Sequence, residues 1–323
     1  MAGVLNLVTF AANFLMMNQA RKKFVVGASA VSLAAVLWGF DGIVFTPRLF
    51  NLQVSYVVFV LHLFPFVLMN FIFFKQYRQL KNFTLHDTVI FALIALFGGA
   101  FGTLAIVKAL FLMNFNHLSI VVLLQKLQPI FAILLAVILL GEKTGRYFLL
   151  WASMAILGGY FLTFGFSLPD LDVDRNTLHA SMLALLAALS FGSSTVFSKM
   201  ILGKYDFVTS VFYRYGFTTV IMFLIMIGFG DFSQFAVTTR QNWIFIAIIC
   251  LTTGSGTMFL YYYGLKKVKA IMATISELMF PISAVIFDYI FNGSLFTPIQ
   301  WISAAVMIFS ILKLNSAGSK GKA

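Results

Sequence analysis

The chain has 323 residues, of which 61% are hydrophobic and 10% are charged, and its mean hydropathy is +0.98. Soluble domains carry about 25% charged residues, so a water-soluble fold is excluded because it could not bury this much apolar surface. The net charge of +12 would suggest nucleic acid in a soluble protein, but here Lys and Arg report first on membrane topology. We expect a lipid bilayer, and no nucleic acid, among the partners.

Apolar residues fall into ten runs of about 20, the length that an α-helix needs to cross the hydrocarbon core of a bilayer. Residues 1–24 precede these runs; they are apolar but short for a span, and we expect this segment to be cytoplasmic or interfacial. The predicted fold class is an all-α polytopic membrane protein with ten transmembrane helices. The spans are predicted near residues 25–46, 54–74, 87–110, 117–140, 146–166, 178–202, 207–229, 241–264, 269–291 and 297–314.

The distribution of basic residues predicts the orientation of these spans. With a cytoplasmic amino terminus, sixteen Lys and Arg residues fall in cytoplasmic links and three fall in outer links. Cytoplasmic loops of membrane proteins carry such an excess, so both termini are predicted to be cytoplasmic. The other three basic residues, Lys108, Lys126 and Arg214, lie within predicted spans and need a separate explanation.

Motifs for metals, cofactors and catalysis are missing from the sequence. Cys250 is the single cysteine, so an internal disulfide and a cysteine-based metal cluster are excluded. The acidic link that begins at Asp170 resembles a calcium loop, but Arg175 and Ser181 stand where such a loop needs Gly and Glu. The sequence also lacks a phosphate-binding glycine loop and the common hydrolase motifs. We therefore predict no cofactor, no metal and no enzyme activity.

The second half of the chain repeats features of the first half at a shift of about 153 residues. Each half holds five predicted spans, an odd number, so the two halves must cross the membrane in opposite orientations. Inverted repeats of this kind are typical of secondary transporters, whose substrate site lies near the midplane between the repeats. The paired features are Trp38-Gly39 with Phe191-Gly192, Gly102-Thr103 with Gly256-Thr257, Ala109-Leu110 with Gly264-Leu265, and Pro129 with Pro281.

This repeat divides the chain into parts. We predict a first five-helix repeat at 25–166, an outer linker at 167–177, a second five-helix repeat at 178–315 and a cytoplasmic tail at 316–323. We refer to the two repeats as the first half and the second half.

From residue 25 to 315 the chain resembles EamA-type members of the drug/metabolite transporter superfamily. The resemblance implies a ten-helix carrier of the bacterial inner membrane. One departure is that the Gly-Glu closing the fourth helix of each half is present only once, as Gly141-Glu142, so we expect Glu142 to make a structural helix-end contact at the cytoplasmic surface. The matching features are Trp38-Gly39, Ala109-Leu110, the run from Gln125 to Glu142, the run from Tyr261 to Leu265, and the run from Glu277 to Pro281.

Ionisable residues deep within the predicted spans are candidates for the functional site. A charge in hydrocarbon costs roughly 2.5–3.5 kcal/mol on insertion scales, so each such residue should face water, substrate or another polar group. Together with one aromatic neighbour they form the predicted substrate-binding set, Trp38, Asp41, His62, Lys126, Arg214 and Glu277.

Each charged candidate has a functional and a structural interpretation. Arg214 is either an anchor for a carboxylate or phosphate, which guanidinium binds through its forked donors, or a residue near the cytoplasmic end of its span that reaches the interface or ties helices together. Lys126 and Glu277 each precede a proline that should kink its helix, and they either lock the two halves by an ion pair or handle substrate or protons.

Two further candidates carry the same ambiguity. Asp41 lies one turn beyond Trp38, so the two could bind an amino group together, or Asp41 could bond to a neighbouring helix or Arg48. His62 could shuttle protons, or it could simply form a hydrogen bond to a neighbouring group.

We predict a secondary transporter that works by alternating access. Charges of both signs favour an amino-acid-like or zwitterionic metabolite, with export, protons as coupling ion and a homodimer as open options. An exchanger of an anionic phosphorylated metabolite is the alternative within this class. Outside it, a non-transporting membrane scaffold or an intramembrane enzyme remains as the alternative.

Overall fold

The structure is a computed structural model that describes residues 2–112, 124–125, 127–166, 175–293 and 297–320. Every regular element in this part of the chain is a helix. Seven helical stretches are long and apolar enough to cross a membrane, and three shorter apolar helices accompany them. The fold is therefore an all-helical membrane protein. The seven stretches are Gln19–Val44, Val54–Ile72, Leu85–Ala109, Leu178–Lys204, Phe207–Phe229, Arg240–Lys267 and Ala270–Phe291, and the shorter helices are Gln128–Leu140, Phe148–Leu162 and Pro298–Leu314.

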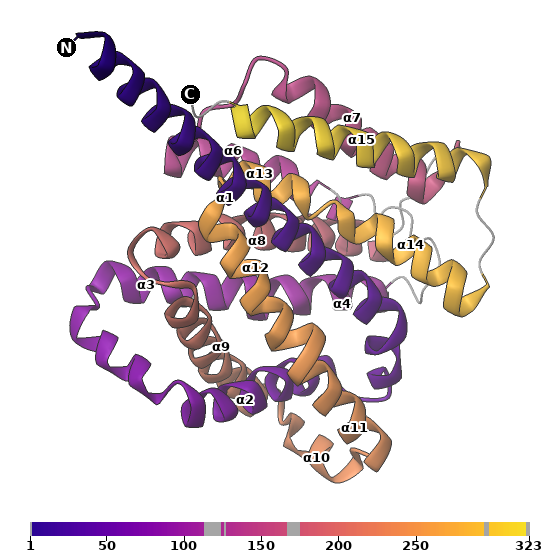
Figure 1. The fold of residues 1–323 in the computed structure, drawn as a ribbon. Helices are drawn as coiled ribbons and strands as arrows, with labels where there is room; N and C mark the ends of the chain where they lie inside the picture. Colours follow the sequence, from indigo (N-terminus) through magenta and orange to yellow (C-terminus); the bar gives the residue numbers. More distant parts are fainter. Residues whose placement is uncertain (1, 113–123, 126, 167–174, 294–296, 321–323) are drawn as a thin grey trace.

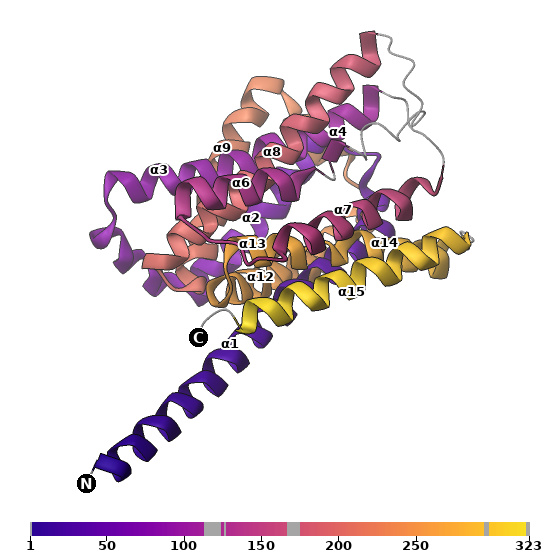
Figure 2. The ribbon, with the colours of Figure 1, turned by 90° about the horizontal axis from the view of Figure 1, so that it is seen from above.

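The first helix, α1 (Ala2–Val44), runs without a break through the expected boundary between segment 1–24 and the first span. Its first turns project away from the other helices in both views (Figures 1 and 2). Residues 117–123 of the predicted fourth span and residues 167–174 of the predicted outer linker lie outside the described part of the chain.

Local sequence explains where several helices begin and end. The Asp206 carboxylate accepts a hydrogen bond from the backbone N–H of Thr209 and caps α9. Gly141 and Gly293 end α6 and α14 in the left-handed conformation, with φ of 62° and 71°. The unbroken helices are α2 (Val54–Ile72), α6 (Gln128–Leu140), α7 (Phe148–Phe164), α8 (Arg175–Lys204), α9 (Phe207–Phe229), α10 (Gln234–Val237) and α15 (Pro298–Lys320), with 3₁₀ turns at Thr46–Leu49, Phe74–Asn82 and Asp231–Ser233.

Two spans, one in each half, contain a π-helical segment. In each, a side-chain capping box precedes the first helix, formed by Thr84 with Asp87 in the first half and by Thr239 with Asn242 in the second. A π-helical segment inside an α-helix usually marks a functional site. The first span consists of α3 (Leu85–Ile94), η3 (Ala95–Phe101) and α4 (Gly102–Leu112), and the second of α11 (Arg240–Ile249), η5 (Cys250–Gly254) and α12 (Ser255–Lys267).

The ninth predicted span is broken into α13 (Ala270–Ser276) and α14 (Met279–Asn292). Pro281 has no N–H to bond the carbonyl of Glu277, and the Phe280 N–H bonds that carbonyl instead at 2.9 Å. The predicted kink before Pro281 is therefore present, and it places Glu277 at the break.

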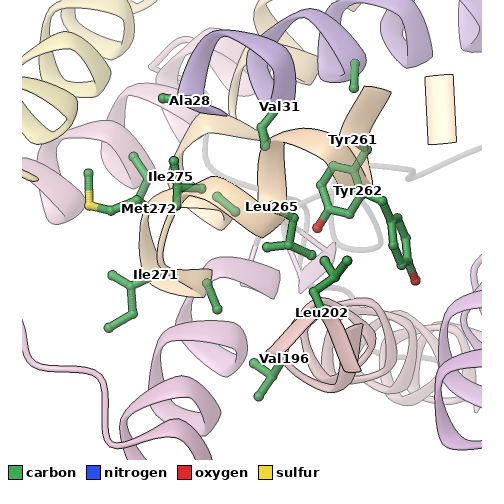
Figure 3. Close-up of a cluster of buried hydrophobic side chains, with 14 of the residues drawn as sticks. Ala28, Val31, Val196, Leu202, Tyr261, Tyr262, Leu265, Ile271, Met272 and Ile275 are labelled. Carbon is green, nitrogen blue, oxygen red and sulfur yellow. The ribbon is translucent and has the colours of Figure 1, made fainter. Parts of the chain in front are cut away.

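The first helix of each half packs mainly against the opposite half. Helix α1 lies along α12, α13 and α14, while α8 lies along α3, α4 and α6 (Figure 1). The remaining helices form cross-half pairs, with α2 beside α9 and α7 beside α15. The largest hydrophobic cluster lies where these elements meet, and Figure 3 shows Val31 of α1, Leu202 of α8, Leu265 of α12 and Ile275 of α13 within it.

Charged side chains close the helix ends at one end of the bundle. The Glu142 carboxylate accepts hydrogen bonds from the backbone N–H groups of Ala270, at 2.7 Å, and Ile271, at 3.0 Å, so it makes the predicted helix-end contact, here at the start of α13. Lys199 of α8 donates to the last carbonyls of α12, including Leu265 O at 2.7 Å. Lys266 of α12 makes the reciprocal contact, because its ammonium group donates a hydrogen bond of 2.9 Å to the carbonyl of Tyr205, just beyond the end of α8.

Candidate functional site

A cavity of about 330 Å³ lies among α1, α6, α8, α9, α12 and α14, where the first helices of the two halves meet the broken span. Its wall combines aromatic rings with amide, hydroxyl and charged side chains, the mixture expected of a small-molecule site. The lining residues include Trp38, Gln125, Gln128, Phe191, Ser194, Thr195, Ser198, Arg214, Tyr261, Thr274, Glu277 and Phe280.

Glu277 is held in this wall by side chains from three other helices. One carboxylate oxygen accepts hydrogen bonds from the Tyr261 hydroxyl at 2.7 Å and from the Thr195 hydroxyl at 3.4 Å. The other oxygen accepts from the Gln128 amide at 3.0 Å. The bonds to α12, α8 and α6 fix the carboxylate at the helix break that Pro281 creates, with one edge on the cavity.

Arg214 of α9 is 7% exposed and reaches the same cavity. Its Nη1 donates to the Tyr262 hydroxyl at 3.2 Å and to the Ser194 hydroxyl at 3.4 Å, and Nη2 donates to the Gly98 carbonyl at 3.4 Å. Nε has no hydrogen-bond partner within the described part of the chain. All three contacts are at the long end of the hydrogen-bond range, so this buried cation keeps donor capacity for a ligand.

The π-helical segment of the first half brings the backbone close to Arg214. A Cβ on Gly98 would collide with Ser194 and would lie 3.1 Å from Nη2 of Arg214. A glycine here lets η3 approach α8 and α9 closely enough to present a carbonyl to the guanidinium.

Aromatic rings form the rest of the wall. Trp38 of α1 and Tyr261 of α12 have ring centroids 5.2 Å apart and an interplanar angle of 50°. Phe191 and Phe280 also line the cavity. These rings offer flat apolar surface, while the Tyr261 hydroxyl connects this surface to Glu277.

Trp38, Arg214 and Glu277 of the predicted set thus line one cavity, and two others do not. Asp41 accepts hydrogen bonds from Thr46 at 2.8 Å and from Thr253 of η5 at 2.7 Å, which matches its structural interpretation. His62 Nδ1 lies 2.8 Å from the Val58 carbonyl, and its ring centroid lies 5.0 Å from that of Tyr215. Lys126 lies outside the described residues.

The sequence prediction missed the neutral polar members of the site. Gln128, Thr195 and Tyr261 hold Glu277, and Ser194 and Tyr262 contact Arg214. Two sequence signals could have indicated them, namely the hydroxyl cluster from Ser193 to Ser198 inside an apolar span and the run from Tyr261 to Tyr263.

Comparisons with known proteins agree with this architecture. The model of the EamA-like transporter family matches residues 25–164 and again residues 178–316. Riboflavin transporter ImpX of Fusobacterium nucleatum is 53% identical over 292 residues, which cover 90% of this chain and 98% of that protein. An uncharacterized transporter of Synechocystis is 24% identical over 265 residues, or 79% of this chain and 74% of that protein.

A crystal structure with 13% sequence identity shares the fold, with a TM-score of 0.69 over 91% of this chain and 98% of the other. The twofold match to one family model and the long, highly identical relative decide the family. The chain belongs to the EamA-like transporter family, and it is an integral membrane transporter.

Proposed function

We propose that this protein carries a riboflavin-class substrate across the membrane through the cavity around Trp38, Arg214 and Glu277. Such a substrate is a flat fused-ring system with carbonyl groups at one edge and a chain of hydroxyl groups. The observation that carries the proposal is a cavity with both aromatic walls and buried polar groups that keep bonding capacity. The Fusobacterium relative, named a riboflavin transporter and 53% identical, supports it.

The wall chemistry fits this substrate class. Trp38, Tyr261, Phe191 and Phe280 can contact a planar ring system through its faces and edges. Arg214 and the amides of the cavity supply donors and acceptors for carbonyl and hydroxyl groups. The volume of about 330 Å³ lies in the range of small-molecule sites.

We propose further that transport proceeds by alternating access between two inverted five-helix repeats at 25–166 and 178–315, in an inner membrane with both termini cytoplasmic. The separate family-model matches to each half, the π-helical segment in each half and the cross-half packing of α1 and α8 support this plan. In such carriers the repeats rock around a central site. Protons, or exchange for a second molecule, would supply the energy.

An amino-acid-like or zwitterionic substrate is the second candidate. Arg214 and Glu277 place opposite formal charges on one cavity wall, where they could bind a carboxylate and an ammonium group. The aromatic walls favour the flat substrate, because a small amino acid would leave much of their surface without contact.

Counterflow in proteoliposomes tests the two candidates. We expect preloaded riboflavin to accelerate uptake of labelled riboflavin, and a panel of amino acids to have no effect. Trp38→Ala should reduce this exchange roughly tenfold or more, because Trp38 is half-buried in the cavity wall and truncating an aromatic anchor costs about 2 kcal/mol or more of binding. Trp301→Ala, which changes an exposed tryptophan of α15 outside the cavity, is the matched control.

Exchange of amino acids without riboflavin would reject the riboflavin proposal in favour of the second candidate. Wild-type exchange by Trp38→Ala would show that substrate does not pass through this cavity. A pH-gradient arm separates proton coupling from exchange, because only coupled transport collapses when the gradient is dissipated.

A further inference from the structure

The cavity contains two polar subsites of opposite hydrogen-bonding character, one around Arg214 and one around Glu277. Helices α8 and α12 each contribute one residue to each subsite. Ser194 and Tyr262 contact the guanidinium, while Thr195 and Tyr261 contact the carboxylate. Consecutive helical residues point about 100° apart, so the two subsites face different sectors of one cavity.

In the subsite around Arg214, the guanidinium can only donate hydrogen bonds. Guanidinium has five N–H donors and no acceptor, and here Nε has no partner among the described residues although the side chain is more than nine-tenths buried. The Nη1 and Nη2 contacts are long, at 3.2–3.4 Å, so a ligand carbonyl that takes the place of one of these partners would gain a charge-assisted hydrogen bond. Thr274 lines the same cavity and has a buried hydroxyl without a partner in the described chain.

The subsite around Glu277 accepts. An ionised carboxylate offers about four lone-pair positions, and Tyr261, Thr195 and Gln128 occupy three of them. A position is left for a hydroxyl donor of the ligand. When Glu277 is ionised, a second anion placed here would meet its charge in a site of low dielectric, where like charges repel strongly.

From this arrangement, and resting on the proposed function, we infer a fixed orientation and a selection rule. Arg214 binds the carbonyl edge of the ring system, and Glu277 binds the hydroxyl chain. Glu277 is therefore the specificity-determining residue that admits the free hydroxyl chain and rejects its phosphate ester. Trp38 and Tyr261 hold the rings between the two subsites.

Equilibrium binding to the purified full chain, followed by flavin fluorescence, tests this rule with three probes. These are riboflavin, its phosphate ester FMN, and lumichrome, which keeps the rings but lacks the hydroxyl chain. Wild type should bind FMN roughly tenfold or more weakly than riboflavin, because like charges placed side by side oppose binding. Glu277→Gln should reduce that ratio to near one and leave lumichrome binding unchanged. Asp288→Asn removes an acid of α14, which lies outside the cavity, and should keep the wild-type ratio.

The Arg214 subsite is tested in the same assay. Arg214→Gln should weaken riboflavin and lumichrome by the same factor, about tenfold, because both present the carbonyl edge and lose a charge-assisted hydrogen bond. The ratio of riboflavin to FMN affinity should stay as in wild type. For the Glu277→Gln variant of the preceding test, unchanged lumichrome binding also shows that the variant protein is folded.

If Glu277→Gln does not fold, Glu277→Ser replaces it, since this neutral side chain also removes the carboxylate and should reduce the gap between riboflavin and FMN. The selection rule is overturned if wild type binds FMN as tightly as riboflavin, or if the gap stays as in wild type when the Glu277 carboxylate is removed. Absence of any flavin binding by wild type would instead overturn the proposed function itself.

Discussion

The two neighbouring residues Trp38 and Gly39 make different contacts. Trp38 lines the cavity, while a Cβ on Gly39 would collide with Ser283 and lie 2.9 Å from the backbone nitrogen of Ala284. Gly192 does the same in the second half, where a Cβ would lie 3.0 Å from Ala132 N. Each glycine lets the first helix of one half touch the backbone of the other half, and the adjacent aromatic ring then reaches the cavity.

A substitution at Gly39 should therefore destabilise the protein. Gly39→Ala adds a methyl group where no space exists, and such overpacking costs about 1–3 kcal/mol. Gly42 lies one turn further along α1 and has nothing within 4 Å of an added Cβ, so Gly42→Ala is the matched control. Thermal unfolding in detergent should show a lower midpoint for Gly39→Ala only; equal midpoints would mean that the contact with α14 is not tight.

At the same scale, the cost of burying charge explains which site residues the sequence could predict. Arg214 and Glu277 stand out because an ionisable group in a span is expensive without a purpose. Thr195 and Tyr261 carry no such signal, since hydroxyl groups are tolerated in any helix and only packing decides which way they point. Asp41 shares a helical face with Trp38, but it lies one turn further along α1. At that level the face contacts Thr253 of η5 and no longer borders the cavity.

Among the elements, the junction between α6 and α13 links the two halves through one side chain. Glu142 follows the glycine that ends α6, and its carboxylate takes the first two free N–H groups of α13. A carboxylate at a helix N-terminus satisfies orphan donors and also interacts favourably with the helix dipole. In the second half, Asn292-Gly293 occupies the corresponding position, so the two halves differ in this contact.

Removing this carboxylate should loosen the start of α13. Loss of a helix cap costs about 1 kcal/mol, so Glu142→Ala should raise the amide hydrogen exchange of Ala270 and Ile271 about fivefold. Lys143→Ala changes the next, exposed side chain and should leave this exchange unchanged. Unchanged exchange in Glu142→Ala would show that the carboxylate does not hold α13.

The sequence predicted the position of a helix or a helix break where a single signal, such as apolar length or a proline, determines it. Apolar length predicted seven stretches that are long enough to span a membrane, and Pro281 predicted the break before α14. The π-helical segments at Ala95–Phe101 and Cys250–Gly254 were not predicted, because they contain no obligatory residue and arise where tertiary contacts favour an extra residue per turn. Composition also did not predict that α1 continues without a break from residue 2 through residue 24 into the first span.

Over the whole molecule, the halves are interleaved, since α1 and α8 each lie among helices of the opposite half. Under the alternating-access proposal, contacts between the two halves at the ends of the bundle would change during transport. The contact of Glu142 with α13 joins the two halves at one such end.

Fixing this junction should arrest transport under the alternating-access proposal. In a Glu142→Cys, Ala270→Cys variant, a short thiol-specific cross-linker should abolish counterflow and leave flavin binding within about twofold, because binding needs one state and transport needs two. Single-cysteine variants treated with the same reagent control for modification, and native Cys250 is buried. Full counterflow after complete cross-linking would exclude opening at this end.

The interleaving of the halves also constrains how the protein is made. Ribosomes deliver α1 first, yet its native neighbours α12, α13 and α14 are synthesised near the end of the chain. Helix α8 meets the opposite situation, because α3, α4 and α6 are already in place when it is inserted. After its insertion, the first span therefore lacks most of its native contacts, including those of Trp38 and Gly39, until nearly the entire chain has been translated and α12, α13 and α14 are in the bilayer.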